Sequence, residues 1–177
     1  MTTTHANYGS NNDDNAAIVI GNDSQAGAGL FGDNNDDNTA VAIGTDSGAS
    51  AGANVVAVSF YNNNTGNKAL AINGGTALAG FNGSDNDNNS ATAFGPDSLA
   101  AAGGGEVFGL TLGNFNTGNE ATATQGGEAL AGVNGDFSDN NTATASDAGS
   151  LASAGSVGFN LDDYDAAATG GQTDVQP

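Results

Sequence analysis

The stretch "NTAVAIGTDSGASAGA", residues 38 to 53, places an alanine at every second position of two short runs. Between the runs lies "GTDS", whose glycine, aspartate and serine favour a turn. Alternation with a period of two, bounded by turn residues, indicates short β-strands rather than a helix. The alternate alanines therefore define one face of two strands that a turn connects.

The same pattern returns along the chain and begins each time with an asparagine. The spacings between these asparagines are 23, 29, 22, 30 and 22 residues, so short and long segments alternate with a combined period of about 52. An Ala-x-Ala-Gly motif follows each first run. The six asparagines are Asn15, Asn38, Asn67, Asn89, Asn119 and Asn141.

This repeat predicts an all-β fold, a parallel β-solenoid or β-roll in which each segment forms one coil around a common axis. We expect about six coils in three repeats of about 52 residues, with the alanines facing a narrow core. Short coils should hold two strands and long coils three. The third strands are expected in the apolar runs at 55–60, 106–115 and 156–161.

The expected organisation has three parts. Residues 1–14 form an N-terminal segment, a candidate strand for donation to a neighbouring molecule. Residues 15–170 form the solenoid, and residues 171–177 form a C-terminal tail.

The six asparagines lie where the chain turns into the first strand of each coil. Asparagine tolerates left-handed backbone, and its amide can stack on the amide of the next coil, as in cross-β ladders. We therefore interpret them as a structural ladder rather than a binding site.

The side chains between the first-run alanines change along the chain from aliphatic to hydroxyl. If the alanines face inward, the aliphatic part is an exposed strip, and such strips usually mark a contact with another chain. The alternative is that the strip belongs to the core, covered by the third strands of the long coils or by residues 1–14. Its members are Ile18, Ile20, Val41, Ile43, Leu70 and Ile72.

Composition excludes several classes of function. With one lysine, no arginine and a formal net charge of −19, the chain would repel nucleic acid. No window approaches the run of about 20 apolar residues that a membrane span needs. There is no cysteine, and the N-terminus shows no signal peptide, so the export route is not visible. The single histidine, His5, and the single lysine, Lys68, form no catalytic motif, and we expect no enzyme and no catalytic residue.

Acidic residues gather in the segments at 32–38, 83–89 and 135–141, where short coils hand over to long ones. Oxygen ligands at this density suit Ca²⁺, although no cofactor is required. The alternative is a set of solvated acidic turns that oppose sideways aggregation. The candidate calcium ligands are Asp33, Asp36, Asp37, Asp85, Asp87, Asp136 and Asp139.

The fragments "NTAVAIG" (38–44), "NKALAIN" (67–73) and "NSATAFG" (89–95), each followed by a turn and Ala-x-Ala-Gly, resemble the head repeats of YadA-like trimeric autotransporter adhesins. The resemblance covers the start of each coil. It implies a left-handed parallel β-roll that forms trimers and projects from a cell surface to bind host matrix or other cells. The coils here are longer and alternate in length, and no neck, stalk or anchor is present in the sequence.

These observations predict a non-enzymatic structural protein that stacks head to tail on copies of itself. The expected product is an extracellular or cell-surface filament. The competing prediction is a binding module, either an adhesin head or a virus fibre segment. An ice-binding solenoid is a further alternative, because threonine pairs such as Thr122 and Thr124 are typical of that class.

Overall fold

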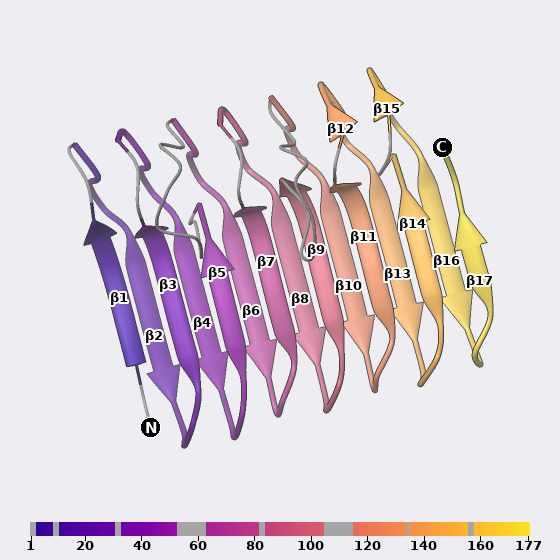
Figure 1. The fold of residues 1–177 in the computed structure, drawn as a ribbon, viewed down its shortest axis with the longest axis horizontal. Coiled ribbons are helices and arrows are strands. Elements are labelled where there is room, and N and C mark those ends of the chain that lie inside the picture. Colours follow the sequence, from indigo (N-terminus) through magenta and orange to yellow (C-terminus); the bar gives the residue numbers. More distant parts are fainter. Residues whose placement is uncertain are drawn as a thin grey trace.

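The computed structural model of the chain describes residues 3–8, 11–30, 33–52, 63–81, 84–104, 115–133, 135–155 and 158–177. All regular structure in these ranges is β-strand, and Figure 1 shows it as two layers of arrows that run in opposite directions across the long axis of the molecule. The strands are β1 (Thr3–Tyr8), β2 (Ala16–Ile20), β3 (Gln25–Leu30), β4 (Thr39–Ile43), β5 (Gly48–Ala51), β6 (Lys68–Ile72), β7 (Thr76–Phe81), β8 (Ser90–Phe94), β9 (Leu99–Gly104), β10 (Glu120–Thr124), β11 (Glu128–Val133), β12 (Gly135–Asp136), β13 (Thr142–Ser146), β14 (Leu151–Ala154), β15 (Gly158–Phe159), β16 (Asp165–Thr169) and β17 (Thr173–Val175).

The strands form two long parallel sheets, to each of which successive coils contribute one strand. The eight-stranded sheet has the order β1-β3-β5-β7-β9-β11-β14-β17, and the seven-stranded sheet has the order β16-β13-β10-β8-β6-β4-β2. Every strand pairs only with its counterparts in the coils before and after it, with no crossover between distant coils. The predicted all-β parallel solenoid is therefore confirmed.

The core between the two sheets consists of alanine. Register keeps alanine on alanine from coil to coil, as for Ala40, which pairs with Ala17 on one side and Ala69 on the other. Every fully buried member of this cluster is an alanine, and Val19, Ala17 and Tyr164 pack against it as partly buried residues. Because each methyl group buries little apolar area, the hydrogen-bonded ladders supply much of the stabilisation.

The additional strands expected in the long coils are only partly visible. The runs at 55–60 and 106–114 lie outside the described residues. In the described part of the third run, 158–161, β15 forms and pairs with β12 of the preceding coil. The N–H of Tyr164 donates to Asn141 Oδ1, 23 residues earlier, so the sixth coil has the length of a short one. The third repeat is consequently shorter than the first two.

The strand pairing also extends past both ends of the expected solenoid. β16 and β17 form a seventh coil that pairs with β13 and β14, so strand structure continues beyond residue 170 into the segment we expected to be a tail. The sequence pattern missed this coil because Tyr164 stands at the asparagine position and Asp174 at an alanine position. β1 pairs with β3 of its own chain, so residues 3–8 already belong to the eight-stranded sheet.

A second apolar cluster lies on the outer face of the eight-stranded sheet. Leu78 and Ala101 pair in register between inward alanines, and they are buried together with Phe81 and Val133. An apolar patch therefore lies on this face from β7 to β11, beside the row that holds Thr76, Leu99 and Glu128. Within the described ranges, no helix is long and apolar enough to cross a membrane.

Candidate functional site

The six predicted asparagines form a hydrogen-bonded ladder inside one corner of the solenoid. Asn67 illustrates the geometry: its Oδ1 accepts bonds from the backbone N–H and from Nδ2 of Asn89, both at 3.1 Å. Its own Nδ2 donates to Asn38 Oδ1 at 3.0 Å and to the carbonyl of Asn86 at 2.6 Å. Asn67 is fully buried. Because this amide uses both its oxygen and its nitrogen within the ladder, it acts as structure.

A glycine closes each coil against this ladder. Gly52, the last residue of an Ala-x-Ala-Gly motif, has a φ of +53°, and a Cβ there would lie 2.4 Å from the Asn38 side chain. Left-handed backbone and the absence of a side chain are both required, which only glycine supplies without strain. The motif therefore encodes two inward alanines followed by the residue that lets the chain pass the amide.

A second buried ladder runs beside the first, three residues earlier in each coil, and the sequence analysis missed it. Asn64 N–H donates to Asn35 Oδ1 at 3.0 Å, and Asn86 N–H donates to Asn64 Oδ1 at 2.9 Å. The signal is an Asn-x-x-Asn pattern, as in "NDDN" at 35–38. Its members are Asn12, Asn35, Asn64, Asn86, Asn116 and Ser138. At the last member the amide is replaced, and the buried Ser138 Oγ has no hydrogen-bond partner.

Three of the candidate calcium ligands lie in one column, in every second coil, and accept backbone hydrogen bonds. Asp36 Oδ1 accepts from the N–H of Asp13 at 2.7 Å. Asp87 Oδ1 accepts from Thr65 at 2.8 Å, and Asp139 Oδ1 accepts from Thr117 at 2.7 Å. Burial raises the pKa of Asp87 and the neighbouring Asp85 carboxylate adds to this, while the hydrogen bond from Thr65 opposes it. These carboxylates act as turn caps.

The other four candidates lie in neighbouring turn positions. Asp85 Oδ1 accepts a bond from Asn63 Nδ2 at 3.0 Å, and Asp37 takes left-handed backbone at φ +55°. The carbonyls of Asp33 and Asp136 accept backbone bonds from the next coil. Among the residues that the structure describes, no group of three or more acidic, histidine or cysteine side chains is arranged to hold a metal ion. The seven candidates lie in three turns along the rod.

An exposed row of left-handed residues follows the same corner and changes chemistry along it. Asn11, Asn34 and Asn63 are linked through their amides at 3.2 Å. Two coils further on, Phe115 and Phe137 occupy the row with φ of +59° and +57°. Their rings stack at a centroid distance of 4.8 Å and an interplanar angle of 5°. Stacking of this kind contributes about 1 kcal/mol, which offsets much of the strain of a left-handed phenylalanine.

The predicted contact strip lies on the outer face of the seven-stranded sheet. Ile18, Val41 and Leu70 pair in one row, and Ile20, Ile43 and Ile72 pair in a second row. Ile18 is 46% exposed and Ile20 is 59% exposed, whereas the other four are half-buried. The strands β2, β4, β6 and β8 carry no acidic residue, and β6 carries the only lysine, Lys68. These four strands are thus free of acids in a strongly acidic chain.

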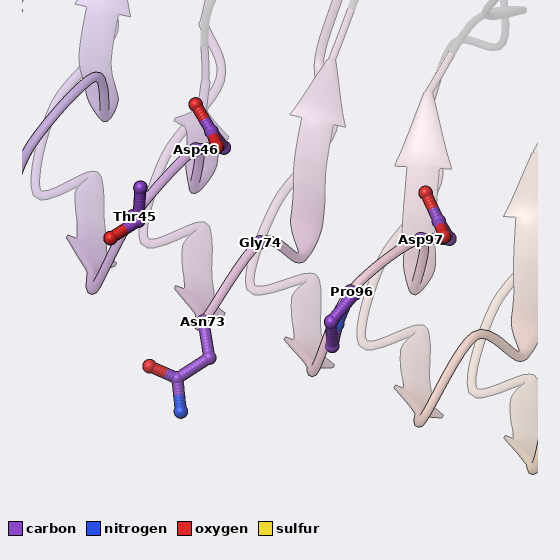
Figure 2. Close-up of a pocket in the computed structure, with 6 residues that line it drawn as sticks. All are labelled: Thr45, Asp46, Asn73, Gly74, Pro96 and Asp97. Carbon is purple, nitrogen blue, oxygen red and sulfur yellow. The ribbon is translucent and has the colours of Figure 1, made fainter.

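The turns at the opposite corner leave one hollow, which Figure 2 shows. It is lined by Thr45, Asp46, Asn73, Gly74, Pro96 and Asp97, from three successive turns. The Asp46 and Asp97 side chains point to one side and that of Asn73 to the other. Gly74, between the flanking turns, contributes no side chain to the hollow.

The seventh coil carries a carboxylate at an inward position. In the eight-stranded sheet, Ala152 pairs with Asp174 of β17, where the preceding coils place alanine. Asp174 Oδ2 accepts a bond from the N–H of Ala167 in β16 at 2.9 Å, and Oδ1 accepts from Gln176 Nε2 at 2.9 Å. These bonds, that from Ala167 first, lower the pKa of Asp174. A carboxylate thus spans the outermost coil from one sheet to the other.

Comparisons of the sequence with family models and with curated proteins, and of the chain with solved structures, find no match. The likeness to YadA-like heads therefore depends on the quoted repeat residues alone.

Proposed function

We propose that this chain is a non-enzymatic structural protein that stacks head to tail on copies of itself into a filament outside the cell or on its surface. The observation that carries the proposal is the uniform cross-section of the solenoid. Ala17 and Val19 of the edge strand β2 face the same core as Ala166 and Ala168 of the edge strand β16. The two edge strands of the seven-stranded sheet thus both direct small apolar side chains into the core.

Strand edges of this kind favour association. An edge strand presents a row of backbone N–H and C=O groups that pair readily with another strand. Contact between two different edges of identical molecules is heterologous, and it produces an open filament when no rotation closes it.

The charge distribution supports growth along the axis over sideways association. The chain carries 20 acidic residues and one lysine. Many of the acids lie in the turns, as Asp36, Asp87 and Asp139 do, and stacked turns form an acidic corner along the rod. Like charges on neighbouring rods repel, so lateral bundling is disfavoured.

The side-chain chemistry supports a role without catalysis. The carboxylates of Asp36, Asp87 and Asp139 accept backbone hydrogen bonds, and the buried amides hold the coils together. We place no substrate, metal or cofactor in this function.

Electron microscopy and light scattering on the purified chain test the proposal. We expect filaments with a distribution of lengths. Val19→Lys puts a charge on the inward side of the β2 edge and should abolish them. Ile20→Lys, the matched control, puts the same charge on the outer face of the same strand and should leave them intact. If the unmodified chain forms only monodisperse short particles at high concentration, the proposal is wrong.

The contact strip favours a second candidate, a binding module that acts through the outer face of the seven-stranded sheet. The exposure of Ile18 and Ile20 and the absence of acids on β2 to β8 are the observations that favour it. Under this candidate the effects of the two variants are reversed. Ile20→Lys disrupts association and Val19→Lys does not, and light scattering gives one small fixed oligomer.

A further inference from the structure

A column of inward residues in the eight-stranded sheet ends in Asp174 on the edge strand β17. This carboxylate opposes pairing of a further strand with that edge. Six alanines precede Asp174 in strict register, one on each strand of the eight-stranded sheet from β3 to β14, and β1 holds Thr4 in this row. The six alanines are Ala26, Ala49, Ala77, Ala100, Ala129 and Ala152. An inward-pointing charge on an edge strand is a known device against further strand pairing. By bonding the N–H of Ala167, Asp174 also occupies a donor on the edge of β16.

The number of strands in the two sheets shows how a second copy would fit. The described chain places eight strands in one sheet and seven in the other, with β1 beside β3 and β2 beside β4 at one edge. If β1 of a second copy were added beyond β17, its β2 would lie two strand spacings, about 10 Å, from β16. At that separation, β2 of the second copy and β16 are too far apart to form hydrogen bonds with each other.

Replacing β17 removes the mismatch. If β1 of the second copy takes the place of β17 beside β14, its β2 lies one spacing, about 4.8 Å, from β16. Both sheets then continue without a gap. β16 of one copy and β1 of the next form one complete coil between them.

β17 and β1 differ in length and in their inward residues, and both differences favour replacement of β17 by β1. β17 spans three residues and β1 spans six. Val175 of β17 is 61% exposed, and the inward residue of this strand is a charge rather than an alanine. The register of β1 on β3 pairs Ala6 with Ala28, so β1 on β14 would bring Ala6 opposite Ala154. β17 is therefore the weaker occupant of this edge.

We infer that β17 is a removable cap on the acceptor edge for a second copy of this chain, that Asp174 holds the cap in place, and that β1 of the incoming copy displaces it. This inference rests on the proposed head-to-tail assembly and names its interface. β1 does not leave its own chain. It stays paired with β3 and gains β14 of the neighbour as a second partner.

The register identifies a cross-link that reports the exchange. His5 of β1 pairs with Gly27, whose row continues through Ser50, Leu78, Ala101 and Leu130 to Ser153 of β14. Within one chain, β1 and β14 are six places apart in the sheet order, about 29 Å, which no disulfide spans. Between copies, the exchange brings position 5 directly beside position 153. The chain has no native cysteine to interfere.

The experiment uses the full chain with His5→Cys and Ser153→Cys together. After mild oxidation, a non-reducing gel should show a ladder of dimers, trimers and longer species. Each single variant should yield dimers at most. Asp174→Ala added to the pair should raise the cross-linked fraction several-fold. Asp165→Ala, which removes a charge from the outer face of β16 in the same coil, should not.

A second pair of cysteines tests the cap directly. Ser153 and Val175 are register partners on β14 and β17. Oxidation of Ser153→Cys with Val175→Cys should fix β17 in place and abolish filaments, and a reductant should restore them.

The outcomes separate this inference from the proposed function. Filaments without any cross-link between positions 5 and 153, or filaments that persist with β17 locked, would overturn the exchange and leave head-to-tail assembly standing. Cross-linked dimers and trimers without filaments would support the exchange and overturn the filament. Absence of both filaments and cross-links in every variant would overturn both.

Discussion

Gly103 packs so closely against Asn89 that a Cβ on the glycine would lie 2.3 Å from Asn89 Oδ1. The backbone of Gly103 is left-handed, at φ +52°. The relationship recurs in every coil that has an asparagine at the ladder position. The other pairs are Gly29 with Asn15, Gly52 with Asn38, Gly80 with Asn67, Gly132 with Asn119 and Gly155 with Asn141. The ladder and the glycine that ends each Ala-x-Ala-Gly motif thus form one structural unit.

Gly103→Ala should destabilise the fold by about 4 kcal/mol, because it combines left-handed strain with overlap against a side chain that the ladder fixes. Gly170→Ala is the matched control. Gly170 is also left-handed, at φ +60°, but nothing lies within 4 Å of its Cβ position. It should cost only about 1 kcal/mol. Denaturant unfolding measures both, and equal losses would contradict this role for the ladder.

Asn89→Asp should cost at least about 3 kcal/mol at pH 7, because the new oxygen cannot donate to Asn67 Oδ1 or to the carbonyl of Asn116. The buried carboxyl would have a pKa above its ordinary value, so protonation should return part of the stability as the pH falls through that pKa. Asn34→Asp makes the same change in the exposed row and should cost less than about 1 kcal/mol. Thermal unfolding across pH 3 to 8 gives the comparison, and a loss in N89D no larger than in N34D would count against the buried ladder.

Ser138→Asn should stabilise the chain by about 1 kcal/mol, since it completes the second ladder where Ser138 Oγ has no hydrogen-bond partner. The ladder geometry directs the new Oδ1 to the N–H of Leu161 in the next coil. Ser138→Ala serves as the control, because it removes the hydroxyl without extending the ladder. The melting temperature should rise for S138N above that of S138A. The reverse order would show that the corner has no room for the amide.

Asp87→Asn should stabilise the protein at neutral pH and keep the acceptor for Thr65 N–H. Burial raises the pKa of Asp87, so the folded state disfavours its ionised form at every pH above that value. As the pH falls through the raised pKa, the native carboxyl becomes protonated and the advantage of the variant disappears. Asp85→Asn removes only the neighbouring charge and should give a smaller gain. A gain for D87N that persists below pH 3 would refute this explanation.

Most of the fold could be predicted from the sequence because the same small residues recur at the same positions of each coil. Alanines such as Ala40 and Ala42 alternate at a spacing that only a strand matches, and the asparagine before each run fixes the length of each coil. The inward alanine face and the parallel sheets followed from these two signals.

The parts that escaped prediction depend on single substitutions within the pattern. Tyr164 and Asp174 hide the seventh coil, because neither residue type matches the repeat, although backbone pairing continues through both. The second ladder was hidden for the opposite reason. In a chain rich in asparagine, the extra members at Asn35 and Asn64 do not stand out until the structure places them in a buried row. The candidate calcium ligands lie in three turns, each two coils from the next, and calcium binding stays a prediction.

The coils differ most in length between the closing glycine and the next asparagine of the second ladder. This interval spans residues 29–35 in the first coil and 52–64 in the second, yet both flanks are held alike. Further residues inserted between such fixed flanks would cost only the slowly growing entropy of loop closure. The rod is therefore a natural display scaffold. Foreign peptides grafted at this corner would be presented at heights set by the strand spacing, and the architecture could diversify there without redesign of its interior.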